Sequence, residues 1–210
     1  MPETSTGGTT SLAASHDGPA DGRTARRDRN RDAVVDALLE LHRMGNLAPT
    51  VAEVAAHSGV SHRSVFRYFD DIDELGRAAV ERQMSLVAHL LELPDVAGRP
   101  LEQRVEALVE QRMILYDAVR PTARVARLRE PFQPVIAQTI ADSRQLLGDQ
   151  LAVVFEPELR AMEPGAADRA LAACDVLLSF ESAELLRQAR QLSVAEASAV
   201  LRDGILALLG

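Results

Sequence analysis

Apolar side chains recur at three- and four-residue spacing along most of the chain, and almost no segment alternates apolar with polar residues. The first pattern is typical of amphipathic helices, whereas alternation indicates half-buried strands. Glycine and proline residues divide the sequence into segments of helical length. The pattern predicts an all-α protein whose helices cover residues 28–43, 51–58, 62–69, 71–92, 101–119, 122–130, 132–156, 166–190 and 194–209.

Three of these helices have clear N-terminal signals. Thr50 with Glu53, and Ser193 with Glu196, have the spacing of a capping box, in which the hydroxyl and the carboxylate each accept a backbone N–H of the other residue. Asp71 is the N-cap of the helix that leads from the front of the chain into its body.

The two short helices at 51–58 and 62–69 have the residue types of a helix-turn-helix. Ala55 is small enough for a close helix crossing, Gly59 allows the sharp turn, and Val65 fills the angle between the helices with Val54 and Val60. Short helix pairs with glycine turns also occur in plain helical bundles. DNA binding is therefore one of two interpretations at this point.

The outer face of the second short helix favours DNA. On a helical wheel Arg63 and Arg67 lie nearly opposite Val65, flanked by Ser64 and Phe66. Arginines one turn apart on such a helix have the geometry to contact guanine edges or phosphates. The alternative is a solvated helix face.

Charge is concentrated in the same region. All 23 basic residues are arginines and the chain carries a net charge of -8, yet residues 21–69 hold eight arginines against six acidic side chains. A basic arm from Arg23 to Arg31 directly precedes the helix pair. A basic front on an acidic body indicates a localised anion-binding surface.

Residues 50–69, TVAEVAAHSGVSHRSVFRYF, followed by Asp73-Glu74-Leu75, resemble the DNA-binding domain of the tetracycline-repressor (TetR) family of bacterial transcriptional regulators. The resemblance covers roughly residues 27–87. It implies a homodimer with an N-terminal DNA-binding domain and a larger C-terminal domain that holds a ligand pocket and the dimer interface.

The expected organisation is a disordered tail over residues 1–22, a three-helix DNA-binding domain over 23–90, and an effector-binding and dimerisation domain over 91–210. The expected function is a sequence-specific, ligand-released homodimeric repressor that binds a palindromic site in double-stranded DNA. Activation has the same sequence signature. The alternative is a helical protein-interaction module without sequence-specific DNA binding.

The resemblance also implies DNA contacts, with Arg26, Arg27 and Arg29 reaching phosphates or the minor groove. The full set of expected contact residues is Arg26, Arg27, Arg29, Thr50, Ser61, Arg63, Ser64, Arg67 and Tyr68. Three positions depart from the family pattern. Phe66 stands where a tyrosine is usual, Arg63 where a small residue is usual, and Ile72 where a lysine is frequent.

Two apolar stripes near the C-terminus are expected to pair with their symmetry mates as a four-helix bundle. One consists of Ala170, Ala173, Cys174, Leu177, Leu178, Phe180, Ala183 and Leu185, and the other of Val200, Leu201, Ile205, Leu208 and Leu209. The alternative is that both stripes are buried in the core of their own chain.

The expected pocket for an unidentified small-molecule effector lies on the central helices and is mainly aliphatic, because aromatic residues make up only 3% of the chain. Its candidate lining residues are Met113, Tyr116, Phe132, Ile136, Phe155, Leu177 and Phe180, with Arg112, Arg120 or Glu181 as polar anchors.

Other functions find little support in the sequence. It contains no nucleophile elbow, glycine-rich phosphate loop or metalloprotease motif, and its five histidines lack metal-ligand spacing, so we expect neither an enzyme nor a cofactor or metal. Cys174, the single cysteine, is expected to be an inert core thiol, with redox sensing as the alternative. No apolar run approaches the ~20 residues of a membrane span, and no signal peptide is evident, so we expect a cytoplasmic protein.

Overall fold

The computed structural model describes residues 19–210, and all regular structure in this range is helical, which confirms the all-α prediction. The tail predicted as disordered over residues 1–22 lies outside the described residues except for its last four, which belong to the first helix. Within the described range, no helix combines the length and the apolar character needed to cross a bilayer.

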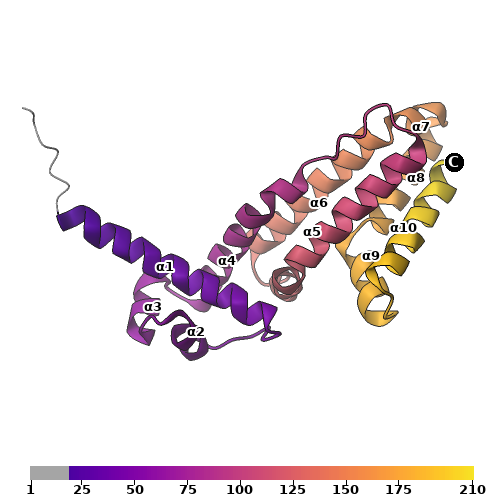
Figure 1. Cartoon of the computed structure of the whole chain (residues 1–210). Helices are drawn as coiled ribbons and strands as arrows, with labels where there is room; N and C mark the ends of the chain where they lie inside the picture. Colours follow the sequence, from indigo (N-terminus) through magenta and orange to yellow (C-terminus); the bar gives the residue numbers. More distant parts are fainter. Residues whose placement is uncertain (1–18) are drawn as a thin grey trace, which may run out of the picture.

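The chain forms a small N-terminal helical group and a larger helical body (Figure 1). The N-terminal helices are α1 (Pro19–Arg43), α2 (Val51–Ser58) and α3 (His62–Tyr68). Helix α4 (Ile72–Val87) and a 3-10 turn (Ala88–Leu91) lead into the body. The body comprises α5 (Leu101–Arg129), α6 (Pro134–Val154), α7 (Glu156–Ala161), α8 (Pro164–Leu177), α9 (Phe180–Glu184), a π-helical turn (Leu185–Ala189) and α10 (Val194–Leu209).

The predicted helix starts are confirmed where a side chain caps the helix. Thr50 and Glu53 form a capping box at α2, and Ser193 and Glu196 form another at α10. At α4, Asp71 Oδ1 accepts the backbone N–H of Glu74 at 2.7 Å. Each cap satisfies a backbone donor that the first helical turn leaves without a partner.

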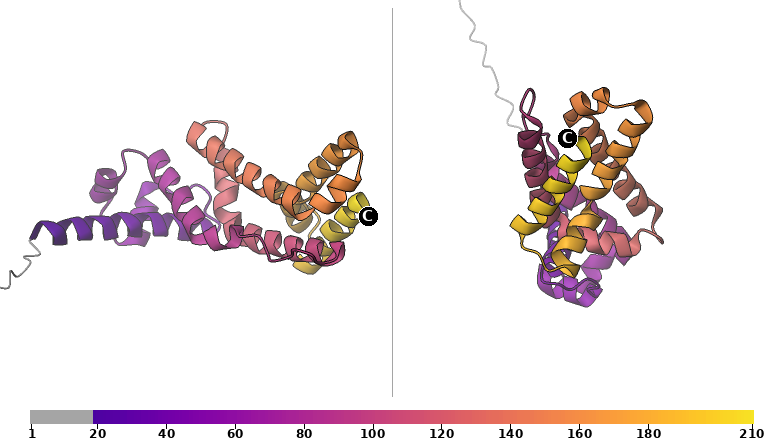
Figure 2. Two further views of the ribbon diagram at one scale, coloured as in Figure 1. Left: turned by 90° about the horizontal axis from the view of Figure 1, so that it is seen from above. Right: turned by 90° about the vertical axis from the view of Figure 1, so that its right-hand side faces the viewer.

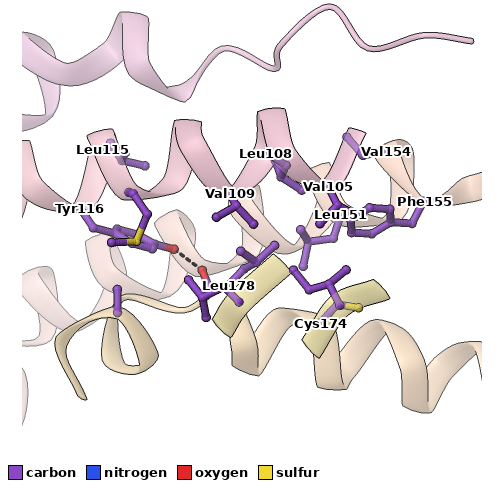
Figure 3. Packing of buried hydrophobic residues seen from close by; sticks show 14 of the residues in the cluster. Val105, Leu108, Val109, Leu115, Tyr116, Leu151, Val154, Phe155, Cys174 and Leu178 are labelled. Carbon is purple, nitrogen blue, oxygen red and sulfur yellow. Dashed lines mark hydrogen bonds between the residues drawn. The ribbon is translucent and has the colours of Figure 1, made fainter. Parts of the chain in front are cut away.

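Two large hydrophobic cores stabilise the described part of the chain. The first lies between α1, α2, α3 and the first half of α4, and its most buried large side chains are Leu39, Phe69 and Leu75. The second lies between α5, α6, α8 and α10 and includes Leu108 and Phe155 (Figure 3). Because α4 contributes to both cores, it joins the two parts of the molecule.

Cys174 lies in the second core and is fully buried. Burial raises the pKa of its thiol to about 11, because the thiolate loses its hydration. Since the thiolate is the reactive form, this environment favours the predicted inert role.

Helix α1 begins at Pro19, nine residues before the predicted start at Asp28. The additional residues from Gly22 to Arg27 are almost all exposed. A helix surrounded by solvent has no apolar stripe, so the hydrophobic pattern could not reveal it. The basic arm is thus the first part of a helix.

The helices predicted over 101–119 and 122–130 are a single helix, α5, with Pro121 inside it. Proline removes one backbone hydrogen bond and usually breaks a helix. Here Leu115 and Tyr116 before the proline and Val125 and Ala126 after it are all buried. Packing on both sides of Pro121 therefore outweighs the tendency of proline to break the helix.

The single helix predicted over 166–190 is also wrong, because the chain leaves the helix at Leu178 and Ser179. Ser179 Oγ accepts the N–H of Ser182 at 3.1 Å and so caps α9. The hydroxyl of Tyr116 donates to the Leu178 carbonyl at 2.5 Å, which satisfies a buried acceptor at the break (Figure 3). A partner from another helix thus stabilises an interruption that local sequence does not encode. The helix predicted over 132–156 likewise divides, because Pro157 lies in the first turn of α7.

His42 lies at the junction of α1, α4 and α5, where only 5% of its surface is exposed. Its Nδ1 has no hydrogen-bond partner among residues 19–210. Burial, together with the positive charge of Arg129, lowers the pKa of His42 to about 4. The folded protein therefore holds this imidazole neutral.

We predict that His42 makes the protein less stable as the pH falls from about 6.5, the ordinary pKa of histidine, to about 4. In this range the unfolded chain binds a proton that the folded chain excludes, which contributes at most about 1.4 kcal/mol per pH unit. Urea unfolding at several pH values should show a shallower decline for His42→Leu than for wild type. The exposed His57 provides the control substitution, and identical slopes for wild type and His42→Leu would refute the assignment.

Candidate nucleic-acid interface and ligand cavity

Helices α2 and α3 form the predicted helix-turn-helix. Gly59 ends α2 with φ 68°, in the left-handed region that favours glycine. Val54 and Val65 are almost fully buried between the helices, and Ala55 is buried beside them. Ser61 caps α3 by accepting the backbone N–H of Ser64 at 3.3 Å. Turn geometry and core packing therefore fix the orientation of α3.

The outer face of α3 presents Arg63, Phe66 and Arg67 to solvent. Half of the Phe66 surface is exposed, and its ring stacks edge-to-face on His62 with centroids 5.0 Å apart. Arg63 makes no hydrogen bond or ion pair within the described part of the chain. Its guanidinium is thus available to a ligand.

Tyr68 is a packing residue at the back of α3. Only 7% of its surface is exposed, and its hydroxyl accepts hydrogen bonds from Asn30 Nδ2 at 3.3 Å and Arg67 Nη2 at 3.2 Å. The bond from Asn30 and then that from Arg67 lower the pKa of Tyr68, because both donors favour the phenolate. The same arginine nitrogen donates to Ser64 Oγ at 3.4 Å. Hydrogen bonds to Tyr68 and Ser64 therefore restrict the orientation of the Arg67 guanidinium.

The remaining expected DNA-contact residues lie on two other elements. Arg26, Arg27 and Arg29 are exposed on the first turns of α1, which extends beyond the helix-turn-helix (Figure 2). The Thr50 hydroxyl donates to Glu53 Oε2 at 2.6 Å in the capping box. Arg31 is anchored instead, with its guanidinium 4.8 Å from the centre of the Phe69 ring.

A cavity of about 330 Å³ lies in the body between α4, α5, α6 and α9. Helix α4 contributes Val80, Gln83, Met84 and Val87 to its wall. Its apolar lining also includes Leu91, Leu115, Val119, Ile140, Leu147, Leu151 and Phe180. The volume lies within the range of small-molecule sites.

Charged groups also line this cavity. Glu181 Oε1 accepts from Arg127 Nε at 2.7 Å and from Arg144 Nη2 at 2.9 Å. These interactions outweigh the effect of burial and lower the pKa of Glu181 to about 2. The Arg127 guanidinium also lies 4.0 Å from the centre of the Phe180 ring. Glu181 is therefore an ionised group with two cationic partners.

Arg112 is a second polar feature of the cavity wall, and only 1% of its surface is exposed. Its Nη1 donates to Gln111 Oε1 at 2.5 Å and its Nη2 to the Leu147 carbonyl at 3.1 Å. Tyr116 also lines the cavity, and burial raises the pKa of its phenol to about 12, so it is uncharged.

Four of the predicted pocket residues line the cavity: Arg112, Tyr116, Phe180 and Glu181. The others do not. Met113 and Phe155 are in the second core, and Ile136 is in a small cluster with Ala126 and Ile140. Phe132 is 83% exposed in the turn before α6. Leu177 lies beside Gly204, and Arg120 pairs with Glu184. The sequence did not lead us to predict that residues of α4 line the cavity. The spacing of Val80, Met84 and Val87 on one face of that helix was the available signal.

No protein-family model and no curated protein matches the sequence. Among the solved structures that match the fold are two transcriptional regulators. A transcriptional regulator from Rhodococcus sp. Rha1 has a TM-score of 0.63 at 18% identity, over 87% of this chain and 95% of that chain. A TetR-family transcriptional regulator from Streptomyces coelicolor has a TM-score of 0.68 at 20% identity, over 86% of this chain and 80% of that chain. The chain has the TetR-family fold.

The TetR-type architecture accounts for the order of the elements: a helix-turn-helix behind a long first helix, and then a helical body. The resemblance carried by residues 50–69 is thereby supported in three dimensions. The individual DNA contacts and the effector pocket remain predictions.

We predict that Gly59→Ala lowers the free energy of unfolding by about 1–2 kcal/mol, the cost of a left-handed conformation for a residue with a Cβ. The added Cβ would meet no atom within 4 Å, so the cost comes from the backbone alone. Gly76 is a matched control, because its Cβ also meets no atom within 4 Å but its φ is not positive. Gly76→Ala should raise stability by up to ~1 kcal/mol through helix propensity. Urea unfolding measures both changes, and equal stability of Gly59→Ala and wild type would contradict the prediction.

Proposed function

We propose that this protein is a sequence-specific DNA-binding transcriptional regulator, acting in the bacterial cytoplasm as a ligand-released homodimeric repressor. The observation that carries the proposal is the outer face of α3. Arg63, Phe66 and Arg67 point to solvent from a helix whose opposite face is locked by Val65 and Tyr68. A rigid helix with exposed arginines one turn apart fits the major groove.

Phosphate contacts would fix the position of α3 on the duplex. Arg26, Arg27 and Arg29 are exposed on the N-terminal part of α1, where guanidinium groups can reach the backbone or the minor groove. Thr50 and Ser64 lie at or near the N-terminal ends of α2 and α3, where positive helix dipoles attract phosphate. Ser61 caps α3 in the same region.

We propose a homodimer interface on α8 and α10. Much of the two predicted apolar stripes is buried inside the protomer itself. The buried stripe residues are Ala170, Cys174, Leu178, Phe180, Ala183, Leu201, Ile205 and Leu209. Val200 and Leu208 remain exposed on α10, with Val176 on α8. A Cβ added at Gly204 on α10 would lie only 3.2 Å from Leu177 Cδ1 on α8. The two helices therefore cross closely at this glycine. A two-fold pair of such faces would present two α3 helices to a palindrome.

Helix α4 is the proposed route from cavity to DNA. Its N-terminal half packs in the core that holds α3, and its C-terminal half forms one wall of the cavity. A ligand that prefers a different α4 position would shift the separation of the two α3 helices and weaken DNA binding by linkage.

Selection of bound duplexes from a random pool, using the purified full-length chain at two salt concentrations, tests the proposal. An enriched palindrome is expected. Enrichment of a single half-site would contradict the dimer. Retention that is only salt-sensitive and shows no enrichment would favour the protein-interaction alternative.

We predict that Arg63→Ala weakens binding to the selected duplex by about 1–3 kcal/mol and relaxes specificity at one position, as expected for a base-reading arginine. Arg67→Ala should weaken DNA binding by a similar amount. Part of this loss would come from the hydrogen bond to the Tyr68 hydroxyl, which holds the Arg67 side chain in position. The control is Arg160→Ala on α7, an exposed arginine paired with Glu156 far from α3 (Figure 1). Fluorescence anisotropy measures the affinities. Wild-type affinity and specificity for both α3 variants would exclude α3 as the reading helix.

A further inference from the structure

Arg112 differs from the other buried arginine of the body in the charge of its partners. Arg104 is also buried, and its Nη1 donates to the carboxylate of Glu158 at 2.9 Å. Arg112 donates to a glutamine oxygen and a backbone carbonyl, both neutral. In the described residues no carboxylate lies within 4.0 Å of its guanidinium. Arg112 is thus a buried cation with no carboxylate in ion-pair contact among the described residues.

An unpaired buried charge is costly, because neutral acceptors replace only part of the lost hydration. Burial accordingly lowers the pKa of Arg112, although the guanidinium remains protonated. Only two of the five N–H groups that a guanidinium carries have acceptors within the described chain. Arg112 lines the cavity, which is the direction from which a further acceptor would approach.

The other cations of the cavity wall are already neutralised. Arg127 and Arg144 share Glu181, and Arg144 also reaches Glu130 at 3.3 Å. Asp175 interacts with Arg112 electrostatically but forms no hydrogen bond or ion pair with it. Its carboxylate lines the cavity and is exposed. Arg112 is therefore the one lining cation in the described residues that has no carboxylate partner.

We propose that the cavity binds a small apolar monocarboxylate, whose carboxylate pairs with Arg112 and whose apolar part lies against the aliphatic wall towards α4. The proposal rests on the effector cavity of the proposed function and names its ligand class. A guanidinium fork matches the two oxygens of a carboxylate.

Size and charge restrict the class further. The cavity volume of about 330 Å³ lies near the lower end of the range of small-molecule sites, about 300–1,000 Å³, which favours a small ligand. A phosphate or dicarboxylate would bring a second negative charge beside Glu181 and Asp175, with no free cation to offset it. One negative charge on an apolar skeleton fits the lining.

The contacts of Arg112 connect this position to α4. Gln111, which accepts from Arg112, donates through Nε2 to the carbonyls of Leu90 and Glu92, both at 2.8 Å. Leu90 belongs to the 3-10 turn that directly follows α4. A carboxylate that competes for the guanidinium would loosen this connection, which supplies a differential contact for the switch.

Calorimetry with two matched pairs of probes tests the proposal on the full-length protein: octanoate against 1-octanol, and 3-phenylpropanoate against 3-phenylpropan-1-ol. Wild type is expected to bind at least one carboxylate about ten- to a hundredfold more tightly than its alcohol, the range for charge-assisted hydrogen bonds in a buried site. Alcohols that bind as tightly as both acids, or no binding of either acid at millimolar concentration, would overturn the proposal.

Variants assign the preference to Arg112. Arg112→Met should remove the preference for the acid while the alcohol still binds, and Arg112→Lys should retain part of it. Arg144→Met is the matched control, since this arginine lines the same cavity but is paired, and it should keep the preference within about threefold. A preference that survives in Arg112→Met would overturn the assignment. If Arg112→Met does not fold, the comparison of acid and alcohol on wild type still decides the ligand class.

The same preparations separate this inference from the proposed function. A protein that selects a palindrome but does not prefer carboxylates would refute the ligand class alone. A protein that prefers carboxylates through Arg112 but selects no DNA sequence would refute the proposed regulator and leave the cavity assignment standing.

Discussion

The rest of the structure depends on the packing of α4 in two places at once. Leu75 and Ala79 are buried in the core that orients α3, while Val87 is buried in the core of the body. Between them, Val80 and Met84 face the cavity. Protein interiors are close-packed, so a shift of this helix at one end must be accommodated at the other. The proposed coupling of ligand to DNA requires no other connection.

Ion pairs at the same junction contribute less. Arg82 pairs with Asp36 of α1 at 3.1 Å, and Arg129 pairs with Asp73 of α4 at 2.6 Å. These side chains are between 30% and 50% exposed, and such pairs are typically worth under about 1 kcal/mol. Burial of a large apolar side chain is worth roughly 1.5–3 kcal/mol. Packing, rather than surface charge, therefore holds α4 in place.

Sequence reasoning was accurate where the determinants are local. Thr50, Gly59 and Ser61 set their own caps and turn, so α2 and α3 were predicted nearly to the residue. It failed where a distant partner decides the structure. Pro121 is tolerated because of packing on both sides of α5, and the break at Leu178 depends on Tyr116 from another helix. Six of the ten candidate pocket residues lie outside the cavity for the same reason, since one helix face does not show whether it borders a core or a cavity.

The coupling through α4 is tested most directly by one titration. The affinity of the full-length protein for its selected duplex is measured at increasing concentrations of a small molecule that calorimetry shows to bind in the cavity. The account predicts that the Kd for DNA rises to a plateau, and that DNA weakens the binding of the small molecule by the same factor. A Kd for DNA that stays constant while the cavity fills would contradict the account.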